Sequence, residues 1–286
     1  MNDQRIAVLT DTGSDCPAEF AAAHDVRVVP LRINYSDGSS YESGVDITTD
    51  EVVERFEQEV PKTSLPSPER IADEFARAKA DGYKAAVFVS ISSGLSATCD
   101  TVRMVARTME DFPVVVVDTL SIGVAAGLVV MEAVRQVEEG VPLSDLEQTL
   151  GMVARNTNVF FTVRDLEYLR RGGRITETIY RLGSVLNIKP VLTCDEEGHY
   201  VIAKKARGWD RALDTELKLI AAIAEKHPKV RLAVSCTSAC ADLYDRMESV
   251  LRERVGNAIE VVRSDISPAL LVHTGPNLVG VAVQGL

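Results

Sequence analysis

Residues 85–98 read AAVFVSISSGLSAT, and this stretch decides the fold and points to a site. The apolar run over 86–91 predicts a buried strand, and the next seven residues carry four hydroxyls and a glycine where a helix begins. Because the first N–H groups of a helix have no partner inside it, such a place binds negatively charged or polar groups. The stretch therefore predicts a strand–loop–helix unit with a ligand at its turn, which Ser96 either attacks or holds.

The first half of the chain repeats this unit. Ser67, followed by Pro68 and Glu69, is a good helix start, with an N-cap, a proline at the first position and an acidic first turn. Strands that alternate with helices favour a parallel sheet covered on both faces. The expected strands are 6–9, 26–31, 86–91 and 114–117, and the expected helices are 50–59, 68–80, 96–109, 121–139 and 143–155.

The pattern changes near residue 157. The segments IKPVLT and HYVIAKKAR flank a turn at 196–198, which predicts an antiparallel hairpin. The other expected elements are strands at 159–163, 232–236, 259–263 and 279–283, and helices at 165–171, 176–186, 209–226 and 239–254. We therefore expect an α/β protein of two domains. Residues 1–157 would form a doubly wound parallel sheet with its helices, and residues 158–286 a smaller α/β (α+β) domain.

Composition narrows the function. The chain has 286 residues and a formal net charge of −11, which argues against nucleic acid or an anionic membrane as the main partner. The start of the chain lacks a signal-peptide pattern, and the apolar run 122–131 is too short to span a bilayer. Five scattered cysteines indicate reduced thiols, so we expect a cytoplasmic protein without stable membrane insertion and without a metal site.

Three further loops carry polar residues that packing alone does not need. In TDTGSD (10–15), Ser14 is best explained as a turn or cap residue, and Asp11 is as consistent with a ligand site as with a turn. In KTSLPSP (62–68), Thr63 and Ser64 are either hydroxyl donors on a stiff loop or part of an ST-turn. In HTGPN (273–277), His273 follows an apolar run, so we expect it at a strand end, where it could hold an oxyanion or titrate near neutral pH.

The segment LRRGGRIT (169–176) concentrates positive charge in an acidic protein. Charge runs are usually solvated, but two adjacent glycines indicate a backbone reason for the sequence. Arg170, Arg171 and Arg174 lie here, and Lys204, Lys205 and Arg207 make a second basic group.

A serine hydrolase is the alternative function. The segment GLSA (94–97) is one methyl group away from the G-x-S-x-G nucleophile elbow, and Ser96, Asp265 and His273 follow the chain order of that fold. However, the sequence has no HGGG-type oxyanion motif. A cluster of hydroxyls at a helix start also suits a carboxylate that stays intact better than one nucleophile.

Read together, these stretches resemble the DegV family, the bacterial fatty-acid-binding proteins also called FakB. The segments TDTGSD, TSLPSP, SISSGLSAT, LRRGGRI, NIKPVL and HTGP occur in the family's order between residues 10 and 276. Ala97, Thr119 and Asn277 depart from the family's usual residues. The resemblance implies that the chain is not an enzyme and has no catalytic residue or cofactor. It would instead hold a long-chain fatty acid in a buried tunnel between its two domains.

The resemblance also implies roles for individual residues. The carboxylate of the bound acid would be presented to a separate FakA-like fatty acid kinase, which makes an acyl-phosphate for phospholipid synthesis. Arg174 and Arg207 would face this kinase or the transferred phosphate. The carboxylate would be bound by Thr63, Ser64, Ser93, Gly94, Ser96 and His273.

Overall fold

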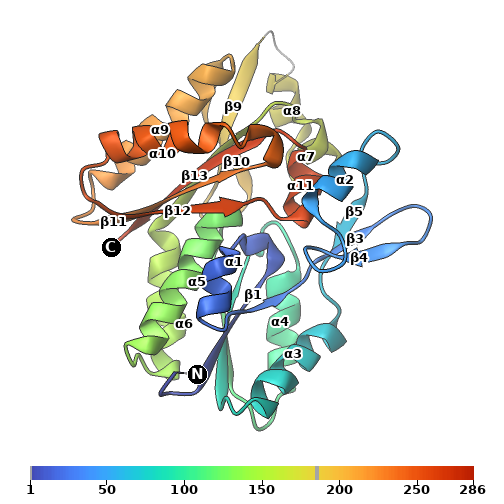
Figure 1. Cartoon of the computed structure of the whole chain (residues 1–286), viewed down its shortest axis with the longest axis vertical. Helices are drawn as coiled ribbons and strands as arrows, with labels where there is room; N and C mark the ends of the chain where they lie inside the picture. The colour runs from blue at the N-terminus through green and yellow to red at the C-terminus, as the bar shows by residue number, and fades with distance from the viewer. Residues whose placement is uncertain (1, 184–186) are drawn as a thin grey trace.

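The computed structural model describes residues 2–183 and 187–286. Two lobes lie one above the other in Figure 1, one built on a parallel sheet and the other on a mixed sheet. This architecture confirms the predicted α/β fold class. The expected helix 176–186 is observed as α8 (Glu177–Gly183), and its last three residues, 184–186, lie outside the described residues.

The N-terminal lobe contains a four-stranded parallel sheet in the order β2-β1-β6-β7. Alternate residues of β1 point to opposite faces: Ile6 and Val8 pack with α1, α5 and α6, whereas Ala7 and Leu9 pack with α3 and α4. The sheet is therefore doubly wound, as predicted. Its elements are β1 (Ile6–Asp11), β2 (Arg27–Val29), β6 (Ala85–Ser90), β7 (Val114–Asp118), η1 (Thr12–Ser14), α1 (Ala18–Ala23), α3 (Pro68–Ala80), α4 (Thr98–Ala106), α5 (Gly123–Glu138) and α6 (Leu143–Arg155).

A small antiparallel sheet, in the order β4-β3-β5, extends from this lobe. The predicted strand 26–31 is observed only as β2 (Arg27–Val29), because the chain leaves the parallel sheet at Pro30, which cannot donate to a ladder, and starts a new strand at Arg32. Strand β5 carries Thr63 toward the other lobe. The elements are β3 (Arg32–Asn34), β4 (Ser40–Glu42), β5 (Lys62–Ser64) and α2 (Thr49–Arg55).

The C-terminal lobe contains a six-stranded sheet in the order β10-β9-β8-β13-β11-β12. Strands β11 and β12 are parallel, and the other neighbours are antiparallel, including the predicted hairpin of β9 and β10. Its elements are β8 (Thr157–Val163), β9 (Ile188–Cys194), β10 (Tyr200–Arg207), β11 (Val230–Cys236), β12 (Ala258–Asp265), β13 (Leu278–Gly285), α7 (Glu167–Arg171), α8, α9 (Trp209–Ala224), η2 (Ser238–Cys240), α10 (Leu243–Arg254) and α11 (Pro268–Thr274).

Helix α5 lies between the two large sheets. Val124 and Leu128 belong to the core shared with the C-terminal sheet, whereas Val130 and Val134 pack in the core of the N-terminal lobe. A helix that is apolar all round is buried on all sides, which explains the run at 122–131 without a membrane. None of the helices in the described residues is long and apolar enough to cross a bilayer.

Helix α11 corrects the expectation for His273. The residue lies in the last turn of this helix and not at a strand end. Ser267 and Pro268 repeat the start signal that Ser67 and Pro68 give to α3, but the short apolar run after them resembles a strand. The helix packs against α2, α7 and the small sheet, which places it where the two lobes meet (Figure 1).

Candidate functional site

A cavity of about 540 Å³ lies between the lobes, with walls from both. Strand β5, the loop after β6 and the start of α4 contribute from the N-terminal side, and the loop after α7, β10 and α11 contribute from the C-terminal side. The structure brings together these residues that the sequence singled out: Thr63, Ser64, Ser93, Gly94, Ser96, Arg174 and His273. Arg207 is absent from the cavity wall.

The backbone N–H groups of the loop at 91–96 donate to acceptors within the protein, whereas the sequence led us to expect unpaired N–H groups there. Each of the six N–H groups from Ile91 to Ser96 donates a hydrogen bond inside the protein. In particular, the Gly94 N–H donates to Ser92 Oγ at 3.0 Å. The side chains of the cavity wall are therefore the next candidates for binding a ligand.

Two buried or half-buried carboxylates hold this loop. Asp11, at the end of β1, accepts hydrogen bonds from the Ile91 N–H at 3.0 Å and from Ser90 Oγ at 3.3 Å. Asp118, at the end of β7, accepts the Ser93 N–H at 3.2 Å. Burial raises the pKa of Asp11 to about 6, against the opposing effect of these backbone donors. Of the two readings of Asp11, the structure supports the turn, since its other oxygen accepts the Gly13 N–H at 3.0 Å at the start of η1.

The glycine at 94 is explained by the other lobe. A side chain there would meet the backbone of the hairpin turn, with its Cβ 2.6 Å from the Glu197 carbonyl oxygen. The Ser92 hydroxyl also donates to the Gly198 carbonyl at 2.9 Å. The β9–β10 turn therefore packs directly on the loop, and Gly94 serves lobe contact even though it also lines the cavity.

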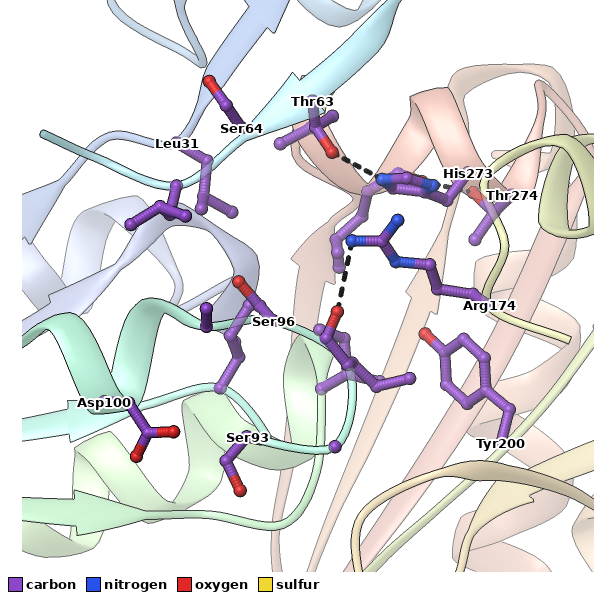
Figure 2. A pocket seen from close by; sticks show the side chains of 18 residues that line it. Leu31, Thr63, Ser64, Ser93, Ser96, Asp100, Arg174, Tyr200, His273 and Thr274 are labelled. Carbon is purple, nitrogen blue, oxygen red and sulfur yellow. Dashed lines mark hydrogen bonds between the residues drawn. The ribbon is translucent and has the colours of Figure 1, made fainter.

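Three of the predicted hydroxyls differ in availability. Ser96 Oγ lies 2.8 Å from Thr98 Oγ1 and accepts the Thr98 N–H at 3.3 Å, so it caps the start of α4. Ser64 Oγ accepts a hydrogen bond from Asn34 Nδ2 at 3.0 Å. Ser93 Oγ is exposed, and in Figure 2 it points away from the side of the cavity where Arg174 and His273 lie.

Thr63 and His273 form the polar centre of the cavity. Thr63 Oγ1 and His273 Nε2 lie 2.6 Å apart across the lobe boundary (Figure 2). The other ring nitrogen, Nδ1, is buried without a hydrogen-bond partner. Burial, aided by the nearby Arg174 charge, lowers the pKa of His273 to about 3. The imidazole is therefore neutral at physiological pH and acts as a hydrogen-bonding group, not as a titrating one.

Arg174 supplies the positive charge. Its guanidinium points into the cavity beside His273 and the Tyr200 hydroxyl (Figure 2). Two of its nitrogens donate to the carbonyls of Gly172 and Leu95, the latter at 3.2 Å across the lobe boundary. Burial lowers the pKa of Arg174, and no carboxylate of the described residues forms an ion pair with it. A guanidinium so placed favours an anionic ligand.

The glycine pair before Arg174 has two separate reasons. Gly173, with φ of +71°, ends helix α7 in the left-handed conformation that glycine adopts easily. Gly172 leaves room for the imidazole, since a Cβ at 172 would overlap His273 Nδ1. The sequence indicated a backbone reason for the pair, but the close contact with His273 carries no sequence signal.

The other predicted cations lie elsewhere. Arg170 and Arg171 both donate to Glu167, at 2.6 to 2.9 Å, so their charge is balanced locally. Arg207 is exposed at the end of the edge strand β10, opposite Ile188. Arg174 is therefore the cation of this basic segment that reaches the cavity.

The rest of the wall is largely apolar and was missed by sequence reasoning. Predicting Tyr200 as a wall residue would have required the register of the β9–β10 hairpin. The aliphatic residues of the wall cannot be told from ordinary core residues in the sequence. These residues are Leu31, Leu65, Ile91, Leu95, Ile122, Ala269 and Leu270.

The hydrolase triad is not assembled. His273 Nδ1 has no hydrogen-bond partner, so no carboxylate orients the ring, and Nε2 contacts Thr63. Asp265 instead accepts a hydrogen bond from the Tyr244 hydroxyl at 3.0 Å and borders a different cavity. The described residues also contain no cluster of three or more His, Cys, Asp or Glu side chains that could hold a metal ion.

Comparison with known proteins agrees with this geometry. The family model for DegV proteins matches residues 5–285. A DegV domain-containing protein of Clostridium acetobutylicum is 31% identical over 281 residues, covering 98% of this chain and 99% of the relative. A fatty-acid-binding DegV family protein of Thermus thermophilus has a similar structure, with a TM-score of 0.89, 32% identity and coverage of 99% and 100% of the two chains. A stearic-acid-binding protein of Eubacterium ventriosum has a TM-score of 0.86, 25% identity and coverage of 98% of each chain.

Proposed function

The chain belongs to the DegV family, and from this premise and the geometry of the cavity we propose that it binds a long-chain fatty acid and presents the carboxylate to a separate fatty acid kinase. The observation that carries the proposal is Arg174, a half-buried cation without an acidic partner, beside Thr63 and the neutral His273. An ionised carboxylate cannot be buried without charge-assisted hydrogen bonds, and these groups would supply them.

Each polar group has a distinct role in this proposal. With its proton on Nε2, the His273 ring would donate to Thr63 Oγ1, which would leave the threonine hydroxyl proton free for one carboxylate oxygen. Arg174 has guanidinium N–H groups left after its two carbonyl contacts, and these provide the countercharge. Ser93 and Ser96 would reach the carboxylate only by rotating their hydroxyls, and Gly94 would shape the wall.

The acyl chain would follow the aliphatic wall away from these groups. A second, smaller cavity shares Ile122, Tyr200, Leu270 and Thr274 with the first and continues inward against the C-terminal sheet. A C16 acid that buries about 14 methylenes gains on the order of 10 kcal/mol before the cost of ordering is subtracted. The ligand would then lie between the proposed domains 1–157 and 158–286, both of which contribute to the wall.

Presentation to a kinase requires one carboxylate oxygen to stay reachable and positive groups near the incoming phosphate. Ser64, Ser93 and Ala97 are exposed or half-exposed around the mouth of the cavity, so that end is open to a partner. Arg174 in the cavity wall and the exposed Arg207 would face the transferred phosphate or the kinase. The acyl-phosphate would then enter phospholipid synthesis, and the chain itself would act as a carrier.

Native mass spectrometry of the protein purified from bacteria tests the proposal. We expect a co-purified mass that matches a C14–C18 acid. His273→Ala should lower this occupancy, whereas His24→Ala, at an exposed ion pair with Glu138, should not. Empty wild-type protein after incubation with such acids, or labelling of Ser96 by a fluorophosphonate probe, would refute the carrier function.

A further inference from the structure

The inner cavity has a glycine in its floor. This cavity, of about 30 Å³, is lined by the start of α5, by α11 and by the face of the C-terminal sheet that looks toward the N-terminal lobe. Gly280 lies on β13, and in the register of the sheet it is flanked by Phe161 of β8 and Ser235 of β11. All three residues line the cavity. A ligand tail that passes Leu270 from the larger cavity would therefore end against Gly280.

The backbone does not require a glycine at this position. The pairing of β13 with both neighbours continues through Gly280 without a bulge. Its φ lies outside the left-handed region, so any residue could adopt this strand conformation. Glycine weakens a strand interior and often marks a place where a ligand comes close. With bulge and backbone strain excluded, the remaining reason is space above the sheet.

The space above Gly280 is small, and the serine and threonine hydroxyls beside it are engaged within the protein. A Cβ at 280 would lie 3.3 Å from Phe161 Cβ and 3.7 Å from Leu278 Cδ2, so one methyl group nearly fits and larger side chains must extend into the cavity. The two hydroxyls of the floor are occupied, since Ser235 donates to the Ser264 carbonyl at 2.8 Å and Thr274 to the Leu270 carbonyl at 3.0 Å. Such a floor suits a hydrocarbon end and not a polar one.

We propose that Gly280 sets the longest straight acyl chain that the tunnel accepts, by leaving room for the methyl end of the ligand against the C-terminal sheet. This inference rests on the proposed fatty-acid function. Phe161, directly opposite in the sheet, forms the side of the same floor. A larger residue at 280 shortens the tunnel from its inner end. It leaves unchanged the Thr63 hydroxyl and the Arg174 guanidinium, which would bind the carboxylate of the ligand.

The test is a competition among straight-chain saturated acids from C10 to C20, offered in equal amounts to delipidated protein and read out by mass spectrometry. Each methylene that can no longer be buried should cost about fourfold in affinity. We therefore expect Gly280→Val to lower the ratio of bound C18 to bound C14 at least about tenfold, and Gly280→Ala to cause a smaller shift in the same direction. Val281→Ile, on the opposite face of the strand in the core with α9, should leave the ratio unchanged.

Phe161→Leu provides the reciprocal change, because it enlarges the floor and should raise the ratio. Gly280→Ala keeps the test decisive if the valine variant does not fold. Wild-type protein that selects a chain length, with the same selection in Gly280→Ala and Gly280→Val, overturns the role of Gly280 and leaves the proposed function standing. Wild-type protein that binds no acid of any length overturns the proposed function and this inference with it.

Discussion

The clearest prediction concerns the charge of Arg174. Among the described residues that line the larger cavity, Arg174 carries the cationic side chain, while His273 is held neutral by burial. Arg174→Gln removes the charge and keeps a hydrogen-bonding amide of moderate length. We expect the variant to fold, since in the part of the chain that the structure describes the guanidinium hydrogen-bonds only the carbonyls of Gly172 and Leu95.

The expected loss of fatty-acid affinity follows from the guanidinium N–H groups that remain available to the carboxylate. Hydrogen bonds to charged groups contribute about 1.5–3 kcal/mol, because the partner charge is desolvated on binding. Removing this interaction should therefore raise the Kd for hexadecanoic acid about 10- to 150-fold. The Kd of Arg174→Lys should lie between those of wild type and Arg174→Gln, since an ammonium group restores the charge but not the planar arrangement of donors.

The assay compares hexadecanoic acid with 1-hexadecanol by titration calorimetry. The alcohol buries the same tail but has no charge, so Arg174→Gln should change its affinity little. Arg171→Gln is the matched control, because Arg171 lies in the same segment, is exposed and pairs with Glu167. Equal losses of affinity for acid and alcohol would refute the countercharge role and assign Arg174 to wall structure alone.

Three other changes follow from the same geometry. Gly172→Ala should displace the His273 ring and lower fatty-acid affinity about tenfold or more, which corresponds to the loss of one charge-assisted contact. Gly256→Ala, where the added methyl group meets open space, should have no effect. Equal affinities of Gly172→Ala and wild type in a binding titration would contradict this prediction. Arg207→Ala should leave lipid binding intact and slow acyl-phosphate formation by the partner kinase, and loss of lipid binding would show that the proposed roles are wrong. Glu216 is fully buried, and burial raises its pKa well above the ordinary 4.5 against the smaller, opposing effect of the Thr162 hydroxyl. The wild type therefore loses up to about 1.4 kcal/mol of stability per pH unit as the pH rises above 4.5. Glu216→Gln should gain stability relative to wild type between pH 5 and pH 8 in urea unfolding, and a pH-independent difference would contradict this.

The sequence predicted the large elements because their signals are local. The helices 68–80 and 143–155 match α3 and α6 to the residue, since each has a clear start and an apolar face. The small sheet was not predicted. Its strands span three residues each, too short for an alternating pattern. β4 follows β3 in a local hairpin, but β5 pairs with β3 from a segment distant in sequence.

Most of the residues that the sequence singled out lie together at one cavity, but their hydrogen bonds with one another had no sequence signal. Thr63 and His273 were both expected near the carboxylate, yet their direct contact at 2.6 Å depends on α11, whose apolar run resembles a strand. Arg174 was expected to face the kinase or the transferred phosphate, and its place in the cavity wall beside His273 and Thr63 had no sequence signal. Its guanidinium contacts with the Gly172 and Leu95 carbonyls likewise depend on how α7 and the loop after β6 are packed.

Helix α11 explains why donors from two lobes can form one site. The N-terminal lobe supplies partners for both of its ends: Asp15 accepts the Ser267 N–H at 2.9 Å and Ser43 accepts the Ala269 N–H at 3.0 Å. At the other end, His273 meets Thr63.

These contacts hold the imidazole and the threonine hydroxyl in place through bonds within the protein itself. Binding energy is lost when donors must be ordered at the moment of binding, so a site with prearranged donors keeps more of it. The seven residues of α11 thus connect the contacts with Asp15 and Ser43 at its start to His273 at its end, where the ligand would bind. A disturbance of its capped end would reach the ligand through His273, although neither Asp15 nor Ser43 borders the larger cavity.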